Sequence, residues 1–305
     1  MKFFLAPMQG LTGYTVRNAF HHHFDYIDKY YTPFIPAAKR MNAKIKRDID
    51  PVNNDGITLI PQAMSIVADE VIDLHRQLVP YGYDEINVNL GCPSGTVVSK
   101  KRGSGILAYP DMLDSFLDKL YTKADFPVSI KTRVGFNDDE LWPKLIEIYS
   151  KYPISELTVH PRVQKDFYKN QPNLGAFHDA VEESKIPLCY NGDIFTPESY
   201  EEMKREFPKV DTFMLGRGIL MNPALLDLIR MREKTDVKKT TDIDVTEWKK
   251  EETLRKMQSA DRYKKEIHAF LEQIKCDYLE VGMGEKNTLF KFCLLYTSPS
   301  PRDPK

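Results

Sequence analysis

Residues 84–95, DEINVNLGCPSG, combine the side chains with the greatest capacity for chemistry. Apolar and amide side chains alternate along residues 86–90, a pattern that predicts a buried strand ending in polar groups. Gly91 and Pro93 flank Cys92, so the thiol is expected on a sharp turn at the carboxyl end of that strand. A lone cysteine in a turn is more often a small apolar residue than a reactive group. A thiol with a pKa of about 8.5 stays mostly protonated at neutral pH, however, which suits Cys92 to donate a proton.

Polar residues and glycines also follow the other predicted strands. Taken alone, each has a plain structural interpretation, because Asn-Gly-Asp usually forms a turn and a buried histidine or lysine usually has a structural partner. Since all of these positions fall at strand ends, we interpret them together as a site for a planar, phosphate-bearing ligand. Glycine N–H groups and an arginine after the last two strands suit the phosphate. The positions are Pro7, Met8, Gln9, Gln62, Asn89, Lys131, Arg133, His160, Arg162, Asn191, Gly192, Asp193, Gly216 and Arg217.

Short apolar segments alternate with segments of helical periodicity along most of the chain. Eight strands with intervening helices predict an α/β fold, and favour a closed parallel (β/α)8 TIM barrel over an open sheet. This fold carries its site on the loops after the strands, where the polar positions fall. The predicted strands are 2–6, 26–31, 57–62, 85–90, 128–132, 156–160, 187–191 and 212–216. The predicted helices begin at residue 12 and otherwise span 68–78, 110–121, 138–149, 173–183 and 197–207.

The composition agrees with an ordinary globular protein. Of 305 residues, 42% are hydrophobic and 29% are charged, and no apolar run approaches the roughly 20 residues of a membrane span. The apolar start of the chain is too short for a signal peptide, so a cytoplasmic location is expected. Basic and acidic residues number 43 and 44, so a nucleic-acid partner would have to contact local basic patches. One such patch, Lys100, Lys101 and Arg102, follows the Cys92 turn.

Neither the cysteines nor the histidines predict a metal site. The cysteines, at positions 92, 189, 276 and 293, share no close spacing, so reduced thiols are expected rather than a zinc knuckle or a disulfide framework. The consecutive histidines His21, His22 and His23 cannot all face one ion from a helix. We expect them to form a solvated helix face.

The pattern changes after the predicted barrel domain, which spans residues 1–232. Residues 233–244 contain almost nothing apolar and predict a linker. Apolar residues recur at helical intervals in residues 245–292 and predict a small helical domain. Residues 293–305 contain three prolines, which cannot continue a helix. Our hypothesis is that this tail is non-native and leaves the helical domain incomplete.

A set of motifs, by its order and spacing, resembles that of the tRNA-dihydrouridine synthases. The motifs are Ala6-Pro7-Met8, Gln62, NVNLGCP at residues 87–93, Lys131-Thr132-Arg133, His160-Pro161-Arg162, Asn191-Gly192-Asp193-Ile194 and Gly216-Arg217-Gly218. The resemblance covers roughly residues 1–230 and is strongest in NVNLGCP. It implies an FMN-dependent oxidoreductase that reduces the 5,6 double bond of specific uridines in tRNA, with NADPH as the electron donor.

The resemblance also implies a role for each matching residue. Hydride transfer from the reduced flavin to carbon 6 of uracil would be accompanied by proton donation from Cys92 to carbon 5. Lys131 would stabilise the anionic reduced flavin, and Asn89 would orient the uracil. Arg133, Arg162 and the patch of Lys100, Lys101 and Arg102 would contact substrate. Pro7, Met8, Gln9, Gln62, Lys131 and His160 would contact the flavin, and Asn191, Gly192, Asp193, Gly216 and Arg217 would hold its phosphate.

The predicted helical domain would contact tRNA, and the resemblance implies a monomer without an obligate protein partner. Two other classes of protein stay open. One is a flavin-dependent barrel acting on a free pyrimidine, as dihydroorotate dehydrogenases do, and the other is an RNA-binding barrel without activity. The helical appendage and Arg162 favour RNA over a free pyrimidine, and Cys92 with Lys131 favours an enzyme. The modified tRNA position and the choice between NADPH and NADH stay open as well.

Overall fold

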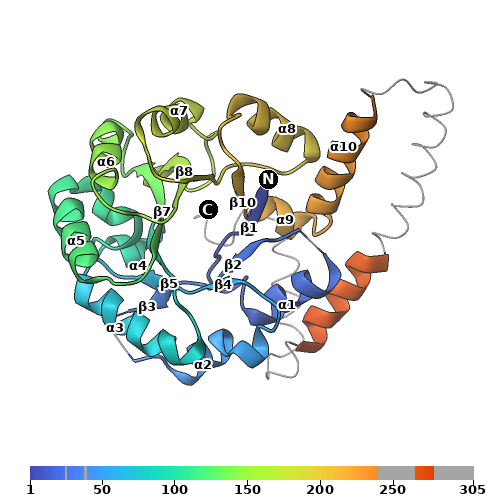
Figure 1. Cartoon of the computed structure of the whole chain (residues 1–305), viewed down its shortest axis with the longest axis horizontal. Helices are drawn as coiled ribbons and strands as arrows, with labels where there is room; N and C mark the ends of the chain where they lie inside the picture. Colours follow the sequence, from blue (N-terminus) through green and yellow to red (C-terminus); the bar gives the residue numbers. More distant parts are fainter. Residues whose placement is uncertain (25, 38–39, 240–264, 278–305) are drawn as a thin grey trace.

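The computed structural model describes residues 1–24, 26–37, 40–239 and 265–277. Its parallel strands form one ten-stranded sheet in the order β3-β5-β6-β7-β8-β9-β10-β1-β2-β4. The two ends of this order meet in the chain, because Pro61 alone separates β4 (Leu59–Ile60) from β5 (Gln62–Met64). β4 pairs with β2 and β5 pairs with β6, so the sheet curls round on itself (Figure 1). The predicted TIM-barrel fold is confirmed.

The strands lie close to their predicted positions, with two informative differences. The second strand starts at Lys29 rather than at residue 26, because Tyr26 has a φ of 80°, outside the strand region. β7 (Val128–Gly135) and β8 (Leu157–Val163) run three residues past their predicted ends. Arg133 and Arg162 therefore lie within strands rather than on loops. The other strands are β1 (Lys2–Leu5), β2 (Lys29–Tyr31), β3 (Ile35–Pro36), β6 (Ile86–Leu90), β9 (Leu188–Tyr190) and β10 (Thr212–Leu215).

Helices surround the sheet (Figure 1), and several of the described helices begin at side-chain caps. Thr196 Oγ1 accepts a hydrogen bond from Ser199 N at 3.2 Å, as expected of an N-cap, and Asn173 Oδ1 accepts one from Ala176 N at 3.1 Å. Among the described helices, none has both the length and the apolar character that crossing a membrane requires. The helices of the barrel are α1 (Tyr14–His23), α2 (Ala43–Ile49), α3 (Ala68–Leu78), α4 (Gly95–Val98), α5 (Pro110–Lys123), α6 (Trp142–Tyr149), α7 (Leu174–Glu183), α8 (Pro197–Glu206) and α9 (Arg217–Met221), with short 3-10 helices η1 (Pro51–Asn53), η2 (Val79–Tyr81), η3 (Gly103–Ala108) and η4 (Gln164–Asp166).

Helix α10 (Leu225–Lys239) begins in the predicted barrel domain and extends into the segment that the sequence predicts to be a linker. Glu233 accepts hydrogen bonds from Tyr200 Oη at 3.0 Å and Lys204 Nζ at 2.8 Å, which ties α10 to α8. The linker predicted from residue 233 is therefore helical as far as Lys239. The rest of the predicted linker and residues 293–305 lie outside the described residues.

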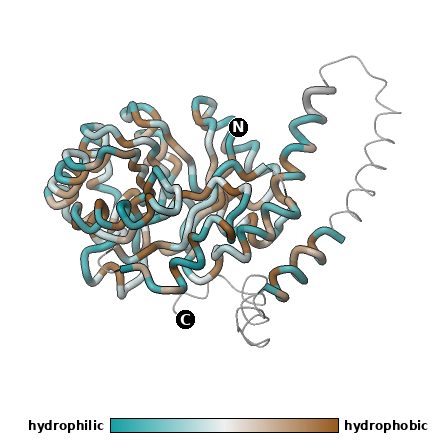
Figure 2. The backbone as a smooth tube through the Cα atoms, turned by 60° about the horizontal axis from the view of Figure 1, so that its bottom comes forward, coloured by the Kyte–Doolittle hydropathy of each residue, from teal (hydrophilic) through white to brown (hydrophobic). Residues whose placement is uncertain are grey.

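Residues 265–277 are helical and lie beside α1. Figure 2 shows hydrophobic and hydrophilic positions mixed along this helix, as an amphipathic segment requires. Phe270 is 3% exposed and packs against the rings of Phe20 and Phe24, with centroids 4.9 Å and 5.5 Å away. These residues fall within the predicted helical domain, whose other residues lie outside the described part of the chain.

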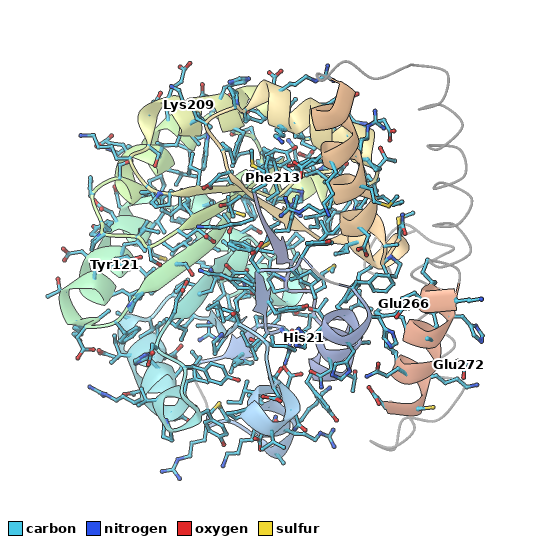
Figure 3. The ribbon with its side chains drawn as sticks, turned by 45° about the vertical axis from the view of Figure 1, so that its right-hand side comes forward. His21, Tyr121, Lys209, Phe213, Glu266 and Glu272 are labelled. Atoms are coloured by element: carbon cyan, nitrogen blue, oxygen red, sulfur yellow. The ribbon has the colours of Figure 1, made fainter. Side chains whose placement is uncertain are left out.

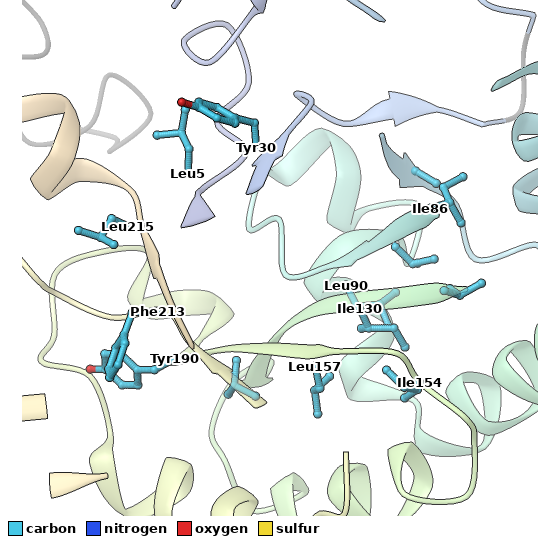
Figure 4. Close-up of a cluster of buried hydrophobic side chains, with 14 of the residues drawn as sticks. Leu5, Tyr30, Ile86, Leu90, Ile130, Ile154, Leu157, Tyr190, Phe213 and Leu215 are labelled. Atoms are coloured by element: carbon cyan, nitrogen blue, oxygen red, sulfur yellow. The ribbon is translucent and has the colours of Figure 1, made fainter. Parts of the chain in front are cut away.

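The main hydrophobic core lies between the strands and the surrounding helices. Figure 4 shows three of its members, Leu90, Ile130 and Leu157, which come from neighbouring strands and are each 0% exposed. A second, smaller cluster of Phe4, Ala6, Tyr31, Ile60, Cys189 and Met214 is separate from it. Because side chains alternate along a strand, this second cluster belongs to the inner face of the barrel. Several buried polar side chains share that face, and they connect the fold to the site.

Candidate functional site

A cavity of about 60 Å³ opens where the carboxyl ends of the strands meet. Its lining contains nine of the residues that the sequence predicts to bind the cofactor: Pro7, Met8, Lys131, His160, Asn191, Gly192, Asp193, Gly216 and Arg217. Tyr168 and Phe195 also line it and were not predicted to bind the cofactor. For Tyr168 the signal was its place among basic residues after β8, whereas Phe195 offers no signal in the sequence.

Lys131 and His160 lie in a strongly cationic environment. Burial and the neighbouring Arg133 lower the pKa of Lys131 to about 7. Burial, with the charges of Arg133, Lys131, Arg162 and Arg217, holds the pKa of His160 well below its ordinary value. His160 Nε2 lies 3.0 Å from Arg162 Nη1, and because arginine only donates, this nitrogen accepts. His160 is therefore a neutral imidazole that carries its proton on Nδ1.

Asp193 joins two arginines at the edge of the cavity. Its Oδ2 accepts a hydrogen bond from Arg162 Nη2 at 2.5 Å, and its Oδ1 accepts one from Arg217 Nη2 at 2.6 Å. The Arg217 guanidinium also lies over the ring of Tyr168, 4.4 Å from its centroid, and 5.3 Å from that of Phe195. The two aromatic rings and the carboxylate hold the cation in place, a geometry typical of a cation–π contact.

Arg133 and Arg162, predicted to contact substrate, are buried, with 1% and 2% of their surface exposed. Arg133 donates to three backbone carbonyls, those of Gly91 at 3.0 Å, Val163 at 2.9 Å and Phe167 at 2.9 Å. Arg162 donates from Nε to the carbonyl of Asn170 at 2.6 Å. In this structure both side chains hold the loop after β8, and they leave almost no surface for an RNA phosphate.

Cys92 lies outside the cavity lining, on the turn after β6, and is 7% exposed. Its carbonyl accepts hydrogen bonds from Ser104 N at 3.1 Å and Ser104 Oγ at 2.9 Å. Gly103 has a φ of +55°, and a Cβ there would lie 2.7 Å from the Cys92 carbonyl oxygen, so this close approach requires glycine. The start of η3 thus buttresses the turn that carries the thiol. The sequence does not point to Ser104 or Gly103 in this role.

Gln62 and Asn89 lie beneath the Cys92 turn, outside the cavity lining. Gln62 is 0% exposed, and its Oε1 accepts a hydrogen bond from Asn89 Nδ2 at 2.7 Å. Asn89 Oδ1 in turn accepts from the backbone N–H of Cys92 at 2.9 Å. The amide of Asn89, predicted to orient uracil, therefore also shapes the turn.

The basic patch of Lys100, Lys101 and Arg102 lies on the surface between α4 and η3. The two lysines are exposed, and Lys101 Nζ lies 4.3 Å from the centroid of the Tyr109 ring. Arg102 is only partly exposed and pairs with Glu70 Oε2 at 3.3 Å. Of the patch, the lysines are the better placed to contact an external phosphate. Gln9, also predicted to line the flavin, is exposed and lies outside the cavity lining.

The cavity has the chemistry that a flat anionic cofactor requires. Pro7 and Met8 supply an apolar wall, and Lys131 and Arg217 supply positive charge. At Gly216 a Cβ would lie 3.5 Å from Ala6 Cβ and 3.8 Å from Met8 Sδ, so the glycine leaves that wall open to a ligand. The residues present therefore fit a flavin with its phosphate.

Solved structures with the same fold include morphinone reductase, with a TM-score of 0.52 and 10% identity over 75% of this chain and 85% of that one. A second is 2-naphthoyl-CoA reductase, with a TM-score of 0.56 and 11% identity over 75% of this chain and 50% of that one. These similarities establish the TIM-barrel fold alone.

This protein belongs to the class of flavin-dependent oxidoreductases that act on carbon–carbon double bonds. More particularly, the model of the dihydrouridine synthase family matches residues 4–282, and the chain belongs to that family. It is 28% identical over 233 residues to tRNA-dihydrouridine synthase B of Pasteurella multocida, covering 73% of this chain and 67% of the relative. It is 30% identical over 175 residues to a probable tRNA-dihydrouridine synthase of Staphylococcus aureus, covering 51% of this chain and 52% of that one. The chain thus spans about half the length of the second relative.

Proposed function

We propose that this protein is a tRNA-dihydrouridine synthase that binds FMN in the cavity of the barrel mouth and reduces the 5,6 double bond of uridine in tRNA. The observation that carries the proposal is the arrangement of one thiol, Cys92, on a buttressed turn next to a cationic cavity, in a chain of the dihydrouridine synthase family. Asn89, just before that turn, pairs in register with Lys131 of the cavity lining, so the thiol and the cavity belong to neighbouring strands.

When bound, FMN would supply the hydride for carbon 6 of the uracil, and NADPH would then reduce the oxidised flavin again. Cys92 donates the proton that carbon 5 requires. Lys131 carries a proton readily once an anionic cofactor lies beside it, because the opposite charge raises a pKa that burial has lowered. Neutral His160, which lines the cavity, keeps a proton on Nδ1 that it can donate. Asn191, Gly192, Asp193, Gly216 and Arg217 surround the proposed phosphate end.

The substrate is proposed to be a uridine drawn out of folded tRNA, which costs a few kcal/mol of unstacking. Exposed Lys100 and Lys101 are suited to contact phosphates near the Cys92 turn, with binding that weakens as salt increases. NADPH as donor, a monomeric state and a cytoplasmic location stay predictions from the sequence.

The first test replaces the proposed acid by Cys92→Ala. We expect the visible flavin spectrum of the purified protein to remain, while dihydrouridine formation in modification-free tRNA falls about 100-fold or more, as loss of a general acid predicts. Cys276→Ala is the matched control, because this thiol is exposed on the helix of residues 265–277. A Cys92→Ala protein with unchanged activity would refute the assignment of the acid.

The same assay separates the two enzyme classes. Modification-free tRNA, uracil and orotate are offered in turn to the flavin-loaded protein, and consumption of NADPH is followed. We expect turnover with tRNA alone. Turnover with orotate or uracil but not with tRNA would instead favour the free-pyrimidine alternative.

A further inference from the structure

Hydrogen bonds continue from the Cys92 turn into the barrel interior. Asn89 Oδ1 accepts from the backbone N–H groups of Gly91 at 3.1 Å and Cys92 at 2.9 Å. Asn89 Nδ2 donates to Gln62 Oε1 at 2.7 Å, and Gln62 Nε2 donates to Asn87 Oδ1 at 2.8 Å. The two asparagines of β6 are thus linked through a glutamine of the neighbouring strand β5.

The same line of hydrogen bonds continues beyond Asn87 and ends at a carboxylate. Asn87 Nδ2 donates to Ser129 Oγ at 3.0 Å, and Ser129 Oγ donates to Glu85 Oε1 at 2.7 Å. The other carboxylate oxygen, Glu85 Oε2, lies 3.4 Å from Lys29 Nζ. We call the series Glu85, Ser129, Asn87, Gln62 and Asn89 the amide relay.

Strand register brings the members of the relay together. Gln62 of β5, Asn87 of β6 and Ser129 of β7 are paired directly across the sheet, and each is 0% exposed. Inward positions of such barrels are usually filled by branched aliphatic side chains. Three adjacent strands therefore carry polar groups, which must all be hydrogen-bonded to be tolerated there.

The carboxylate determines the direction of every bond in the relay. An ionised carboxylate only accepts, so Ser129 must donate its one hydroxyl proton to Glu85 and accept from Asn87. Asn87 therefore presents Nδ2 to the serine and Oδ1 to Gln62, which in turn must present Nε2 to Asn87 and Oε1 to Asn89. Asn89 must then donate with Nδ2, and its Oδ1 remains to accept the two N–H groups of the turn.

We propose that Glu85, Ser129 and Asn87 are positioning residues for Cys92, acting through Gln62 and Asn89. The inference rests on the proposed function, in which the Cys92 thiol is the proton donor. A reversed Asn89 amide would place its NH₂ group against the N–H groups of Gly91 and Cys92 and leave them unsatisfied, at a cost of about 1–3 kcal/mol each. By excluding that orientation, the relay keeps the turn in one geometry.

The test is Ser129→Ala in the full-length, flavin-loaded protein. The matched control is Thr158→Val, because Thr158 lies on the next strand, is as fully buried as Ser129 and is not a member of the amide relay. Two quantities are measured: the rate at which the pre-reduced protein reduces tRNA in a single turnover, and the rate at which iodoacetamide alkylates Cys92, followed on its own peptide by mass spectrometry.

We expect Ser129→Ala to lower the single-turnover rate roughly 10- to 100-fold, as loss of alignment does, with the KM for tRNA and the flavin spectrum unchanged. Alkylation of Cys92 should become several-fold faster because its turn opens more often. Thr158→Val should change neither rate. Ser129→Ala with wild-type values of both rates would overturn the proposal.

A second variant keeps the outcome decisive. If Ser129→Ala does not fold, Glu85→Gln replaces it, since an amide at that position both donates and accepts and no longer imposes a direction. Faster Cys92 alkylation in Glu85→Gln supports the relay, and an unchanged rate overturns it. Alkylation needs no turnover, so it tests the relay even if Cys92→Ala keeps its activity and the proposed function itself fails.

Discussion

At the scale of single residues, the barrel mouth concentrates positive charge before any ligand arrives. Burial lowers the pKa of Lys131 to about 7, with Arg133 as the second cause, and holds the pKa of His160 well below its ordinary value. An anion entering this mouth would stabilise the charged form of Lys131. Residue types at strand ends predicted this cationic lining from the sequence, but the pKa shifts depend on burial and could not be predicted.

The lowered pKa of Lys131 predicts how stability depends on pH. Its folded pKa of about 7 lies below the unfolded value of about 10.4, so the unfolded chain binds the proton more tightly between these values. The charged lysine destabilises the folded state fully below pH 7, and this penalty is lost as pH rises towards the unfolded pKa. In flavin-free protein, Lys131→Met should therefore raise the free energy of unfolding more at about pH 6 than at about pH 9.

Urea unfolding of both proteins at the two pH values measures this difference. Lys209→Met serves as the control, because this lysine is exposed at the molecular surface (Figure 3) and should give no pH-dependent difference. An equal gain for Lys131→Met at both pH values would contradict the expected desolvation of Lys131.

At the scale of elements, local signals predicted helix α3 with its bounds and the start of α8 at Pro197. The break at Pro61 and the long β7 and β8 were not predicted, because they depend on pairing between strands. The role of Arg133 was missed for the same reason. Its acceptors, on Gly91, Val163 and Phe167, lie far away in sequence, so the resemblance implied a substrate contact whereas burial makes Arg133 a link between loops.

Arg133→Lys tests that link. A lysine keeps the charge but lacks the planar fork that reaches three carbonyls, so we expect a loss of about 2 kcal/mol of stability. Amide hydrogen exchange should become faster in residues 91–93 and 164–170, which Arg133 connects. Arg205→Lys is the control, since Arg205 is exposed and donates to one carbonyl of its own helix. Unchanged exchange in both loops would count against the link.

At the scale of the whole molecule, the helix of residues 265–277 packs against α1. His23 Nδ1 lies 2.7 Å from Glu266 Oε1 and His23 Nε2 lies 2.9 Å from Gln273 Oε1, while Phe270 packs between α1 side chains. Figure 3 shows Glu266 next to α1, which also carries His21. Helical periodicity predicted this segment to be helical. Its packing against α1 could not be predicted in the same way, because the contacts join residues about 250 positions apart. His23, expected on a solvated face, is instead a contact of this interface.

Phe270→Ala tests whether this packing holds the helix to the barrel. Truncating a buried phenylalanine costs about 3–5 kcal/mol. We expect this cost to exceed the free energy that keeps a single peripheral helix docked. Amide exchange in residues 265–277 should therefore become much faster, while the strands keep their protection and the flavin spectrum stays unchanged. If the helix orients tRNA, the KM for tRNA should rise more than kcat falls. Glu272→Ala, on the exposed side of the same helix, should change none of these quantities (Figure 3). Wild-type exchange in Phe270→Ala would mean that other contacts hold the helix in place.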